Sequence, residues 1–575
     1  MGIRNPSRAR KKRKQIFPEL PNLTFSRDLS SWLPQSIIVA AILFSSSVYL
    51  WPSPLEFPMD DTYIHFVYAE NLAETGRLFF NFPDEVGVGS SSLLWVLILA
   101  AGNLVNLSMH WVAKLVGMAA LAAVGTGLYQ LLKPILSPWF ALALSLLVIL
   151  SGHMLWFALS GMETMLFLAL GILALLCYRE GRWVLMGILL GLLVITRIEG
   201  VILALVIGLF DIWRNRGIRR GLVMAGSICV LICSPWILYL WFRTGNFLPT
   251  SGIGRHHSNI YAIQIATENM ESLNFLSRFP ALAYPLVWIG YSLEFILGGY
   301  SLPAPYLDIN LGLGMFSYRV SIWAILGLVL VVAPLIWVST RRLVNYLKQR
   351  GWEKDNERIP LVIFLAWMVL HNLCYMIYLP IIGSASRYAS LNHIALWLAL
   401  GMGVWYLRRY MYGKWLAVGL LTIAFANMIY WNQVYDANLE HMANVRIAAA
   451  DYINEQVPDD ELFAASDVGA LRFYGQRPLI DLGGLIDPDL NDWYEAGRLD
   501  QYLVENGVDC LALPGLSENS AGGIFDLAKE MGFSQSDLFD LRQEKVFVID
   551  HETWLFGYLP TVNYQATVTL YTLVD

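Results

Sequence analysis

Charged residues are scarce in this chain of 575 residues. Asp, Glu, Lys and Arg make up 15% of it, whereas 56% of its residues are hydrophobic. Soluble globular domains carry about a quarter charged residues, so the shortage excludes an ordinary soluble protein. The apolar residues fall in runs of roughly twenty, about the length that crosses a bilayer, and these runs predict a polytopic α-helical membrane protein with roughly 10–12 membrane segments.

Cysteine is also rare, with five residues in the whole chain. Four of them lie in apolar segments, and Cys510 is alone in the C-terminal part. This distribution excludes a disulfide framework and a thiolate metal cluster.

Basic residues are nearly missing from the C-terminal part. Residues 436–575 hold 25 of the 45 acidic residues but only 7 of the 39 basic ones, so they carry −18 while the first 435 residues carry +12. We therefore divide the chain into a basic cytoplasmic tail (1–30), a membrane module (31–434) and an extracytoplasmic domain (435–575). Helical and strand-like segments mix in the last part, which predicts an α/β domain.

The basic clusters predict the topology. Residues 4–14 hold seven Lys or Arg and no acid, which suits a cytoplasmic N-terminus beside anionic lipid and is too short a tract to indicate nucleic-acid binding. The apolar run at 35–51 has no cleavage site and should stay as the first membrane helix. Basic clusters between later apolar runs mark further cytoplasmic loops of a multi-pass plasma-membrane protein. The loops expected outside are 52–90, 153–162, 196–199, 243–280 and 381–389.

Three segments do not fit full spans in this topology. Segments 91–107 and 112–132 cannot both cross, so one should lie at the interface or re-enter, and 281–298 is expected to behave in the same way. The stretch 183–213 is too short for two complete helices. We expect a hairpin of two short helices with TRIEG (196–200) at its tip, and irregular backbone at membrane depth marks a candidate site.

Asp60 and Asp61 precede a run with Ile64, Val67 and Tyr68 on one face, which predicts an amphipathic helix at the membrane surface. One interpretation is a helix N-cap, which contributes about 1 kcal/mol. The other is a general base whose neighbouring carboxylate raises its pKa, orients it or helps to hold a cation. The two interpretations are compatible.

Other ionisable residues fall in the predicted outward loops: Glu163 in SGMET, Arg197 and Glu199 in TRIEG, and Arg387 in GSASRYASLNH. A purely structural interpretation pairs Arg197 with Glu199 and lets Arg387 snorkel to the headgroups. Ionisable groups at membrane depth more often line a site, however. Carboxylates and arginines on one face would suit removal of a proton and binding of a phosphate.

The long loop contains Arg255, His256 and His257 in NFLPTSGIGRHHSN. Adjacent histidines are weak signs of a metal site, because they point apart on a helix and no third ligand is marked. Substrate contact or a solvated loop is favoured. In the C-terminal domain, the aromatic residues and aspartates should serve mainly the core, turns and caps; they are Trp493, Tyr494, Trp554, Asp467, Asp481 and Asp487.

These residues together resemble a known class. The acidic pair followed by AENLAETGRLFFNFPDEVGVGSSSLLW is similar to the first outward loop of GT-C glycosyltransferases that use polyprenyl-phosphate sugars, which include protein O-mannosyltransferases, aminoarabinose transferases and mycobacterial arabinofuranosyltransferases. SGMET, TRIEG and SRYASLNH resemble later elements in order, and SDVGALRFYGQRPLIDLGGLIDPDL resembles a phrase of the outward domain. The resemblance covers most of the chain, and its first and last motifs are the specific ones.

The resemblance implies a GT-C-like membrane module and a reaction. A sugar on a polyprenyl phosphate would be the donor, and an extracytoplasmic glycan, lipid or protein would be the acceptor. Asp61 or Asp60 would deprotonate the acceptor hydroxyl, which displaces the lipid phosphate with inversion; alignment of the surface helix favours Asp61.

The other expected site residues would bind substrate. Arg387 and Arg197 would offset charge on the phosphate, and Glu163 would bind sugar or acceptor or support the base. Glu199, Tyr388, Arg255 and His256 complete the expected substrate contacts. No cofactor is implied as essential, and a divalent cation stays open because some relatives bind one near the acidic pair.

Two other functions stay open on the sequence alone. Broken helices and charges near the midplane also mark secondary transporters of polar solutes, although matching inverted halves are not evident here. A non-catalytic glycan-binding membrane protein would use the outer domain for binding and the membrane part as an anchor.

Overall fold

A computed structural model describes residues 29–51, 55–83, 85–256, 285, 288, 306–310, 317–379, 383–487, 489–515, 527–548 and 567–574. The basic tail, His257, Trp554 and most of the segment 281–298 lie outside these ranges. Predictions about those residues stay predictions.

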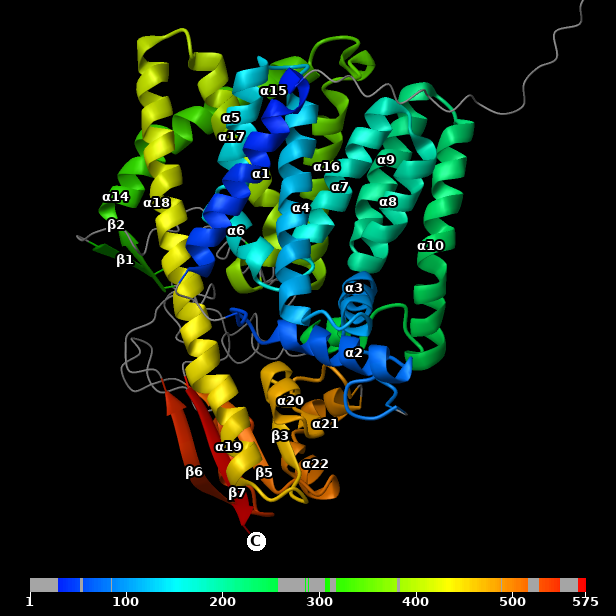
Figure 1. The fold of residues 1–575 in the computed structure, drawn as a ribbon, viewed down its shortest axis with the longest axis vertical. Helices are drawn as coiled ribbons and strands as arrows, with labels where there is room; N and C mark the ends of the chain where they lie inside the picture. Colours follow the sequence, from blue (N-terminus) through cyan, green and yellow to red (C-terminus); the bar gives the residue numbers. More distant parts are fainter. Residues whose placement is uncertain are drawn as a thin grey trace, which may run out of the picture.

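The membrane module is a bundle of helices (Figure 1). Its elements are α1 (Leu29–Leu50), α3 (Leu93–Leu104), α4 (Met109–Leu132), α5 (Pro138–Ile149), α6 (Gly152–Leu159), α7 (Thr164–Glu180), α8 (Trp183–Thr196), α9 (Gly200–Asn215), α10 (Arg220–Thr244), α14 (Ile322–Gly327), a π-helical turn (Leu328–Val332), α15 (Ala333–Leu347), α16 (Ile359–Tyr378), α17 (Ser390–Leu407) and α18 (Met411–His441). In the described residues, seven helices are long and apolar enough to cross a membrane, and the pair α5 and α6, bent by 60°, would make an eighth if the two form one span. The predicted polytopic α-helical fold is confirmed, with seven or eight candidate spans in the described residues where roughly 10–12 membrane segments were expected.

The outside of the bundle is apolar. Phe44, Leu231 and Phe242 are 72%, 72% and 81% exposed, and such side chains recur on α1, α10, α15 and α18. On a soluble protein this surface would aggregate, whereas a bilayer supplies the apolar surroundings that it needs. We call the end of the bundle beside the α/β domain the domain end, and the opposite end the far end (Figure 1).

Apart from 281–298, which lies mostly outside the described residues, the segments that did not fit full spans form helices of the expected lengths. α3 has 12 residues, or about 18 Å at the rise of an α-helix, and is too short to cross the membrane alone. α4 follows it with 24 residues. The stretch 183–213 forms two short helices, α8 of 14 and α9 of 16 residues, joined at residues 197–199.

The helix after the acidic pair, α2, spans Asp61–Thr75 and ends at Gly76, whose φ of +71° provides a left-handed cap. Its place differs from the prediction. Residues Thr62 to Ala69 are buried on all sides, because α2 is sandwiched between the bundle and the α/β domain (Figure 1). The apolar face that suggested a membrane-surface helix therefore packs on protein.

The chain enters the α/β domain without a break. α18 continues through a π-helical stretch (Met442–Ile447) into α19 (Ala448–Gln456), so that 46 residues form one continuous helix. The helix continues past the membrane because Val445, Ala449 and Ile453 are buried in the domain core.

The domain contains a five-stranded mixed sheet in the order β4-β3-β5-β7-β6. The strands are β3 (Phe463–Ala465), β4 (Leu479–Asp481), β5 (Cys510–Gly515), β6 (Asp540–Val548) and β7 (Thr567–Val574). β3 runs parallel to β4 and β5, while β7 is antiparallel to β5 and β6. Short helices complete it: α20 (Gly469–Gly475), α21 (Leu490–Ala496), α22 (Leu499–Glu505) and α23 (Leu527–Glu530). The predicted α/β character is confirmed, although α20 and α21 were not predicted.

The remaining described elements are small. β1 (Tyr306–Asn310) and β2 (Ser317–Ser321) form an antiparallel hairpin. Short 3₁₀ turns occur at Trp352–Lys354, Ser384–Ala389 and Phe533–Gln535.

Close helix packing in the bundle can be tested at two glycines. A Cβ on Gly117 of α4 would lie 1.9 Å from the Ala158 carbonyl oxygen of α6, whereas a Cβ on Gly208 of α9 would meet nothing within 4 Å. We expect Gly117→Ala to destabilise the protein by about 1–3 kcal/mol through overpacking. Gly208→Ala should leave stability unchanged or raise it by up to about 1 kcal/mol, because alanine favours the helix. Thermal unfolding in one detergent checks this, and equal melting temperatures would contradict it.

Candidate active site

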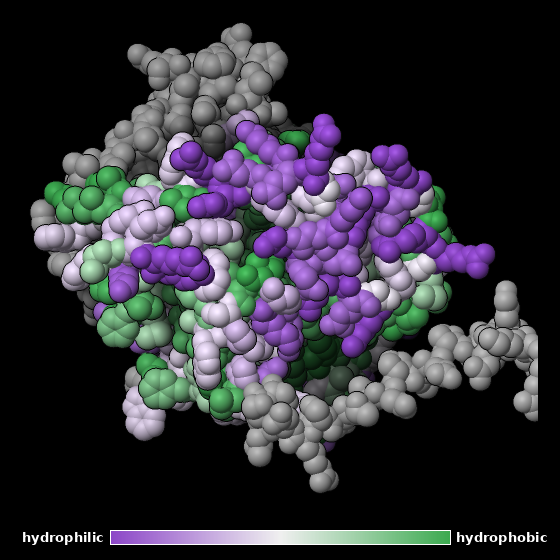
Figure 2. All heavy atoms as spheres, turned by 90° about the horizontal axis from the view of Figure 1, so that it is seen from above, coloured by the Kyte–Doolittle hydropathy of each residue, from purple (hydrophilic) through white to green (hydrophobic). Residues whose placement is uncertain are grey.

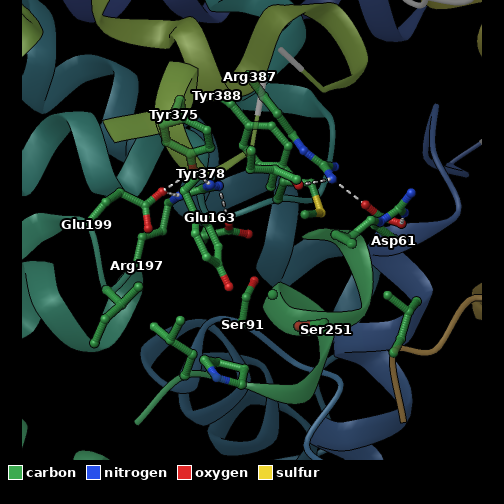
Figure 3. Close-up of a pocket in the computed structure, with 18 of the residues that line it drawn as sticks. Asp61, Ser91, Glu163, Arg197, Glu199, Ser251, Tyr375, Tyr378, Arg387 and Tyr388 are labelled. Atoms are coloured by element: carbon green, nitrogen blue, oxygen red, sulfur yellow. Dashed lines mark hydrogen bonds and ion pairs between the residues drawn. The ribbon is translucent and has the colours of Figure 1, made fainter. Parts of the chain in front are cut away.

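A cavity of about 400 Å³ lies at the domain end of the bundle. Its walls are mostly apolar, and its charged residues come from five separate parts of the chain (Figure 3). The residues that we predicted from sequence and that line it are Asp61, Glu163, Arg197, Glu199, Arg255, Arg387 and Tyr388. Asp60 and His256 do not line it.

Asp61, the first residue of α2, faces two arginines. Arg387 forms a hydrogen-bonded ion pair with its Oδ2, and Arg255 Nη2 lies 3.5 Å from its Oδ1. Burial alone would raise the pKa of Asp61, but Arg387 and then Arg255 outweigh burial and hold this pKa well below its usual value. The Asp61 carboxylate is therefore ionised in the free protein at neutral pH.

Arg387 is held by the irregular turn Ser384–Ala389. Ala385 and Ser386 have φ values of +51° and +60°, a conformation that costs non-glycine residues energy and persists only where the surroundings fix it. The guanidinium is 6% exposed and also donates to Tyr388 Oη at 3.0 Å. Snorkelling to the headgroups is thus wrong for Arg387, because its charge is neutralised inside the protein by Asp61.

The TRIEG tip carries a second charged network. Arg197 Nη1 donates to Glu163 Oε1 at 2.8 Å, and its Nε donates to Glu199 Oε1 at 2.6 Å. The predicted pair of Arg197 and Glu199 is present and extends to Glu163. Tyr375 Oη lies 2.9 Å from Arg197 Nη2 and donates to Glu199 Oε1 at 2.6 Å. Arg197 is therefore hydrogen-bonded through all three of its guanidinium nitrogens.

Sequence reasoning missed two members of this site. His65 lies four residues after Asp61, and its Nε2 is 3.5 Å from Glu163 Oε2 while Nδ1 is 2.9 Å from Ser90 Oγ. The spacing of four residues puts it on the same side of α2 as Asp61, and that signal was available. Tyr375 sits in an apolar membrane run, where nothing in the sequence distinguished it.

Asp60 points away from the cavity into the α/β domain. Its two carboxylate oxygens accept hydrogen bonds from the backbone N–H groups of Gly469 and Ala470, at 2.7 and 2.8 Å, at the start of α20. The N-cap interpretation is wrong for Asp60, because it makes no side-chain cap bond within its own helix and binds the start of α20 in the domain instead. Successive residues on a helix point about 100° apart, which separates Asp60 from Asp61.

Burial and then the neighbouring Asp467 raise the pKa of Asp60 to about 7. Asp467 itself accepts a hydrogen bond from Arg446 Nη2 at 2.6 Å, and Arg446 Nε lies 4.0 Å from Asp60. Asp60, Asp467 and Arg446 thus form a buried charged junction between α2 and the domain.

The domain also supplies one wall of the cavity. Leu485 lines it, and the loop around Leu485 packs against bundle loops at points where only glycine fits. A Cβ on Gly87 would lie 1.4 Å from the Ile486 carbonyl oxygen, and a Cβ on Gly254 would lie 2.1 Å from that of Gly484. Asp481 holds this loop by accepting hydrogen bonds from the N–H groups of Gly483, Leu485 and Ile486.

The other domain residues follow the prediction. Asp487 accepts hydrogen bonds from the Asp489 N–H and the Tyr502 hydroxyl. Trp493 and Tyr494 pack against the domain core.

His256 lies beside the cavity and not in its wall. Its ring stacks on Tyr378 with centroids 4.4 Å apart, and Nδ1 is 2.5 Å from the Tyr378 carbonyl oxygen. Across the described residues, no group of three or more His, Cys, Asp or Glu side chains could hold a metal ion. The divalent cation stays a prediction.

Comparison with known proteins adds the fold class. A domain of unknown function, DUF8728, matches residues 431–569, and none of the curated proteins matches the sequence. The oligosaccharyltransferase of Archaeoglobus fulgidus in its apo form superimposes with a TM-score of 0.52 at 12% identity over 84% of this chain and 70% of that one. The oligosaccharyltransferase AglB from the same archaeon, in complex with an inhibitory peptide and a dolichol-phosphate, gives a TM-score of 0.50 at 14% identity over 84% of this chain and 70% of that one. ArnT from Cupriavidus metallidurans with undecaprenyl phosphate gives 0.49 at 15% identity over 94% and 98%.

The chain has the GT-C fold. The similarity to the archaeal structures establishes this architecture at identities too low to carry an activity. The GT-C resemblance drawn from the first outward loop and the domain motif is therefore confirmed for the fold.

The role of Asp60 in docking the domain can be tested by hydrogen exchange. Asp60→Ala removes both acceptors from the start of α20, so the amides of Gly469 and Ala470 should exchange at least tenfold faster, because a charge-assisted hydrogen bond is worth about 1.5–3 kcal/mol. Asp60→Asn keeps one oxygen and should give an intermediate rate. Glu74→Ala, at an exposed position on the same helix, is the control. Unchanged exchange in Asp60→Ala would show that the contact does not hold the domain.

Proposed function

We propose that the protein is a membrane glycosyltransferase that moves a sugar from a polyprenyl-phosphate donor to an acceptor hydroxyl with inversion, with Asp61 as the general base. The proposal rests on one observation: the Asp61 carboxylate lines the cavity and lies between two arginines, Arg255 and Arg387. This arrangement puts a proton acceptor beside groups that bind phosphate. The GT-C fold supports it, and an AglB structure of that fold was solved with a dolichol-phosphate.

We further propose that the N-terminus is cytoplasmic and the α/β domain extracytoplasmic. The basic clusters 214–220, 341–358 and 408–414 all lie at the far end of the bundle (Figure 1). Figure 2, viewed onto that end, has many hydrophilic side chains gathered there. Cytoplasmic loops carry an excess of Lys and Arg, which supports this orientation. The cavity then belongs to the outer half of the protein.

The proposed reaction has one displacement. The acceptor O–H gives its proton to Asp61 as its oxygen forms a bond to the anomeric carbon. The bond between that carbon and the phosphate oxygen breaks on the opposite face, and the lipid phosphate leaves with the electron pair. Arg255 and Arg387 are the arginines nearest Asp61, so they are best placed to offset the charge that grows on the phosphate.

A base needs a pKa near the working pH, and the free protein holds the pKa of Asp61 far too low. Donor binding offers a solution. The Arg255 side chain is 42% exposed and lies 3.5 Å from Asp61, whereas that of Arg387 is 6% exposed and tightly paired. Arg255 therefore turns from Asp61 to the donor phosphate, which raises the pKa of Asp61 when the acceptor needs a base.

The Arg197 network has a different role in this proposal. Because Arg197 already pairs with Glu163 and Glu199 and contacts Tyr375, we assign it to shaping the cavity, and we assign phosphate binding to Arg255 and Arg387. Glu163 and His65 then remain to contact the sugar or the acceptor. Apolar lining residues such as Val201, Ile202 and Leu379 suit the first units of an isoprenoid. The acceptor class, whether glycan, lipid or protein, stays open.

Loss of the base tests the reaction. Asp61→Asn should lower the rate of sugar transfer about 10²- to 10⁴-fold, because the amide cannot accept the proton. Glu74→Gln on the same helix should keep full activity. The donor is first identified from the lipid-linked sugars that accumulate in a strain lacking the protein, and transfer is measured with the purified protein and that donor. Full transfer by Asp61→Asn, or solute uptake that needs no lipid-linked sugar, would refute the proposal.

The exchange of Arg255 predicts a pH effect. Arg255→Gln removes a positive charge beside Asp61 in the free enzyme, so the pKa of Asp61 rises and the acidic limb of kcat/KM moves to higher pH. The acidic limb of kcat should move less, because Arg255 has already left Asp61 in the donor complex. Burial and then Asp467 also raise the pKa of Asp60. Both pH profiles are therefore compared between the wild-type protein and Arg255→Gln, because this substitution changes a charge beside Asp61 and not one beside Asp60. A shift of equal size in both profiles would exclude the exchange.

A further inference from the structure

A second hollow lies at the far end of the bundle, outside the candidate active site. It has a volume of about 300 Å³ and is formed by the end of α7, the start of α8, the end of α9 and the loop before α16. Three arginines line it, Arg179, Arg214 and Arg219, with Glu180 as its one lining acid. Asp211 pairs with Arg219, and Arg179 lies 3.5 Å from Glu357 and 3.8 Å from Glu180, so the positive charge that these acids leave in the hollow comes mainly from Arg214.

The arginines are held in place before any ligand binds. Asp211 is fully buried below the hollow and binds Arg219 through both carboxylate oxygens. The Arg219 guanidinium also lies 4.5 Å above the Trp183 ring, and its side chain is still 40% exposed. Arg179 donates to the Gln130 carbonyl oxygen at 2.8 Å. A ligand in the hollow thus meets ordered guanidinium groups and loses little entropy in arranging them.

The surroundings of the hollow indicate an amphipathic ligand. Apolar residues next to its lining residues in the sequence are exposed on the same helix ends. They are Val184 at 48%, Leu185 at 42%, Trp213 at 57% and Ile218 at 67%. A free phosphate would leave these side chains unused, whereas a phospholipid with its phosphate in the hollow would lay its acyl chains over them.

We propose that this hollow binds the headgroup of an anionic phospholipid. Arg214 and Arg219 hold the phosphate, with Arg179 at the back, and the acyl chains run along the lipid-facing sides of α8 to α10. The orientation proposed above puts the hollow in the cytoplasmic leaflet, where basic pockets between helices meet anionic lipid. The site does not depend on the glycosyltransferase reaction.

The test uses the purified full-length protein in a mild detergent. Thermal unfolding is followed while dioleoyl-phosphatidylglycerol, dioleoyl-phosphatidylcholine or inorganic phosphate is added. Arg214→Gln is the main variant, because Arg214 hydrogen-bonds to the neutral side chains of Asn356 and Tyr178. Arg350→Gln is the matched control, since Arg350 is exposed after α15 and does not line the hollow.

Phosphatidylglycerol should stabilise the wild-type protein more than phosphatidylcholine does. Arg214→Gln should need about fivefold more phosphatidylglycerol for the same effect, as expected for one basic residue at a lipid surface, while Arg350→Gln should match the wild type. Arg214→Lys should recover most of the affinity, which separates loss of charge from misfolding.

Three results would overturn the proposal. Equal stabilisation by the two lipids would show that the headgroup charge is not recognised. If phosphatidylglycerol stabilised Arg214→Gln and Arg350→Gln equally less than the wild type, the effect would come from general surface charge and not from this hollow. Stabilisation by inorganic phosphate that matches phosphatidylglycerol would identify a site for the free anion.

Discussion

The start of α2 is the constraint on which the rest of the site depends. Two consecutive carboxylates there serve opposite partners: Asp60 binds the backbone of the α/β domain, and Asp61 binds two arginines of the membrane module. One helical turn thus ties the position of the cavity carboxylate to the docking of the domain. Because helix geometry fixes the angle between the two side chains, neither contact can shift without moving the other.

Charge compensation explains why so many ionisable groups tolerate burial near the membrane. Arg197, Arg255 and Arg387 face Asp61, Glu163 and Glu199 in the same cavity, so positive and negative groups balance there. Removing one partner from such a set leaves an uncompensated buried charge, which is strongly destabilising. An arriving phosphate adds negative charge to a balanced site, and the half-exposed Arg255 is the group best able to respond.

The sequence predicts what depends on neighbours along the chain and misses what depends on distant contacts. Hydropathy and charge were enough to predict the helical bundle and the short hairpin at TRIEG. The pattern of helical and strand-like segments predicted the α/β character of residues 435–575. They could not give the role of Asp60, whose partner Gly469 is 409 residues away. They also misplaced α2, because an apolar helix face looks the same whether it meets lipid or protein. The turn that positions Arg387 was also missed, because its left-handed residues are Ala385 and Ser386 and not the glycines that usually mark such a turn.

The unbroken helix from α18 into α19 limits how this protein can move. With 46 residues it spans about 69 Å, and it joins the two parts without a flexible hinge. A tilt of α18 in the bilayer would therefore move the whole domain with it, because no flexible linker separates the two. Because Leu485 of the domain lines the cavity, such a movement would also change the shape of the cavity.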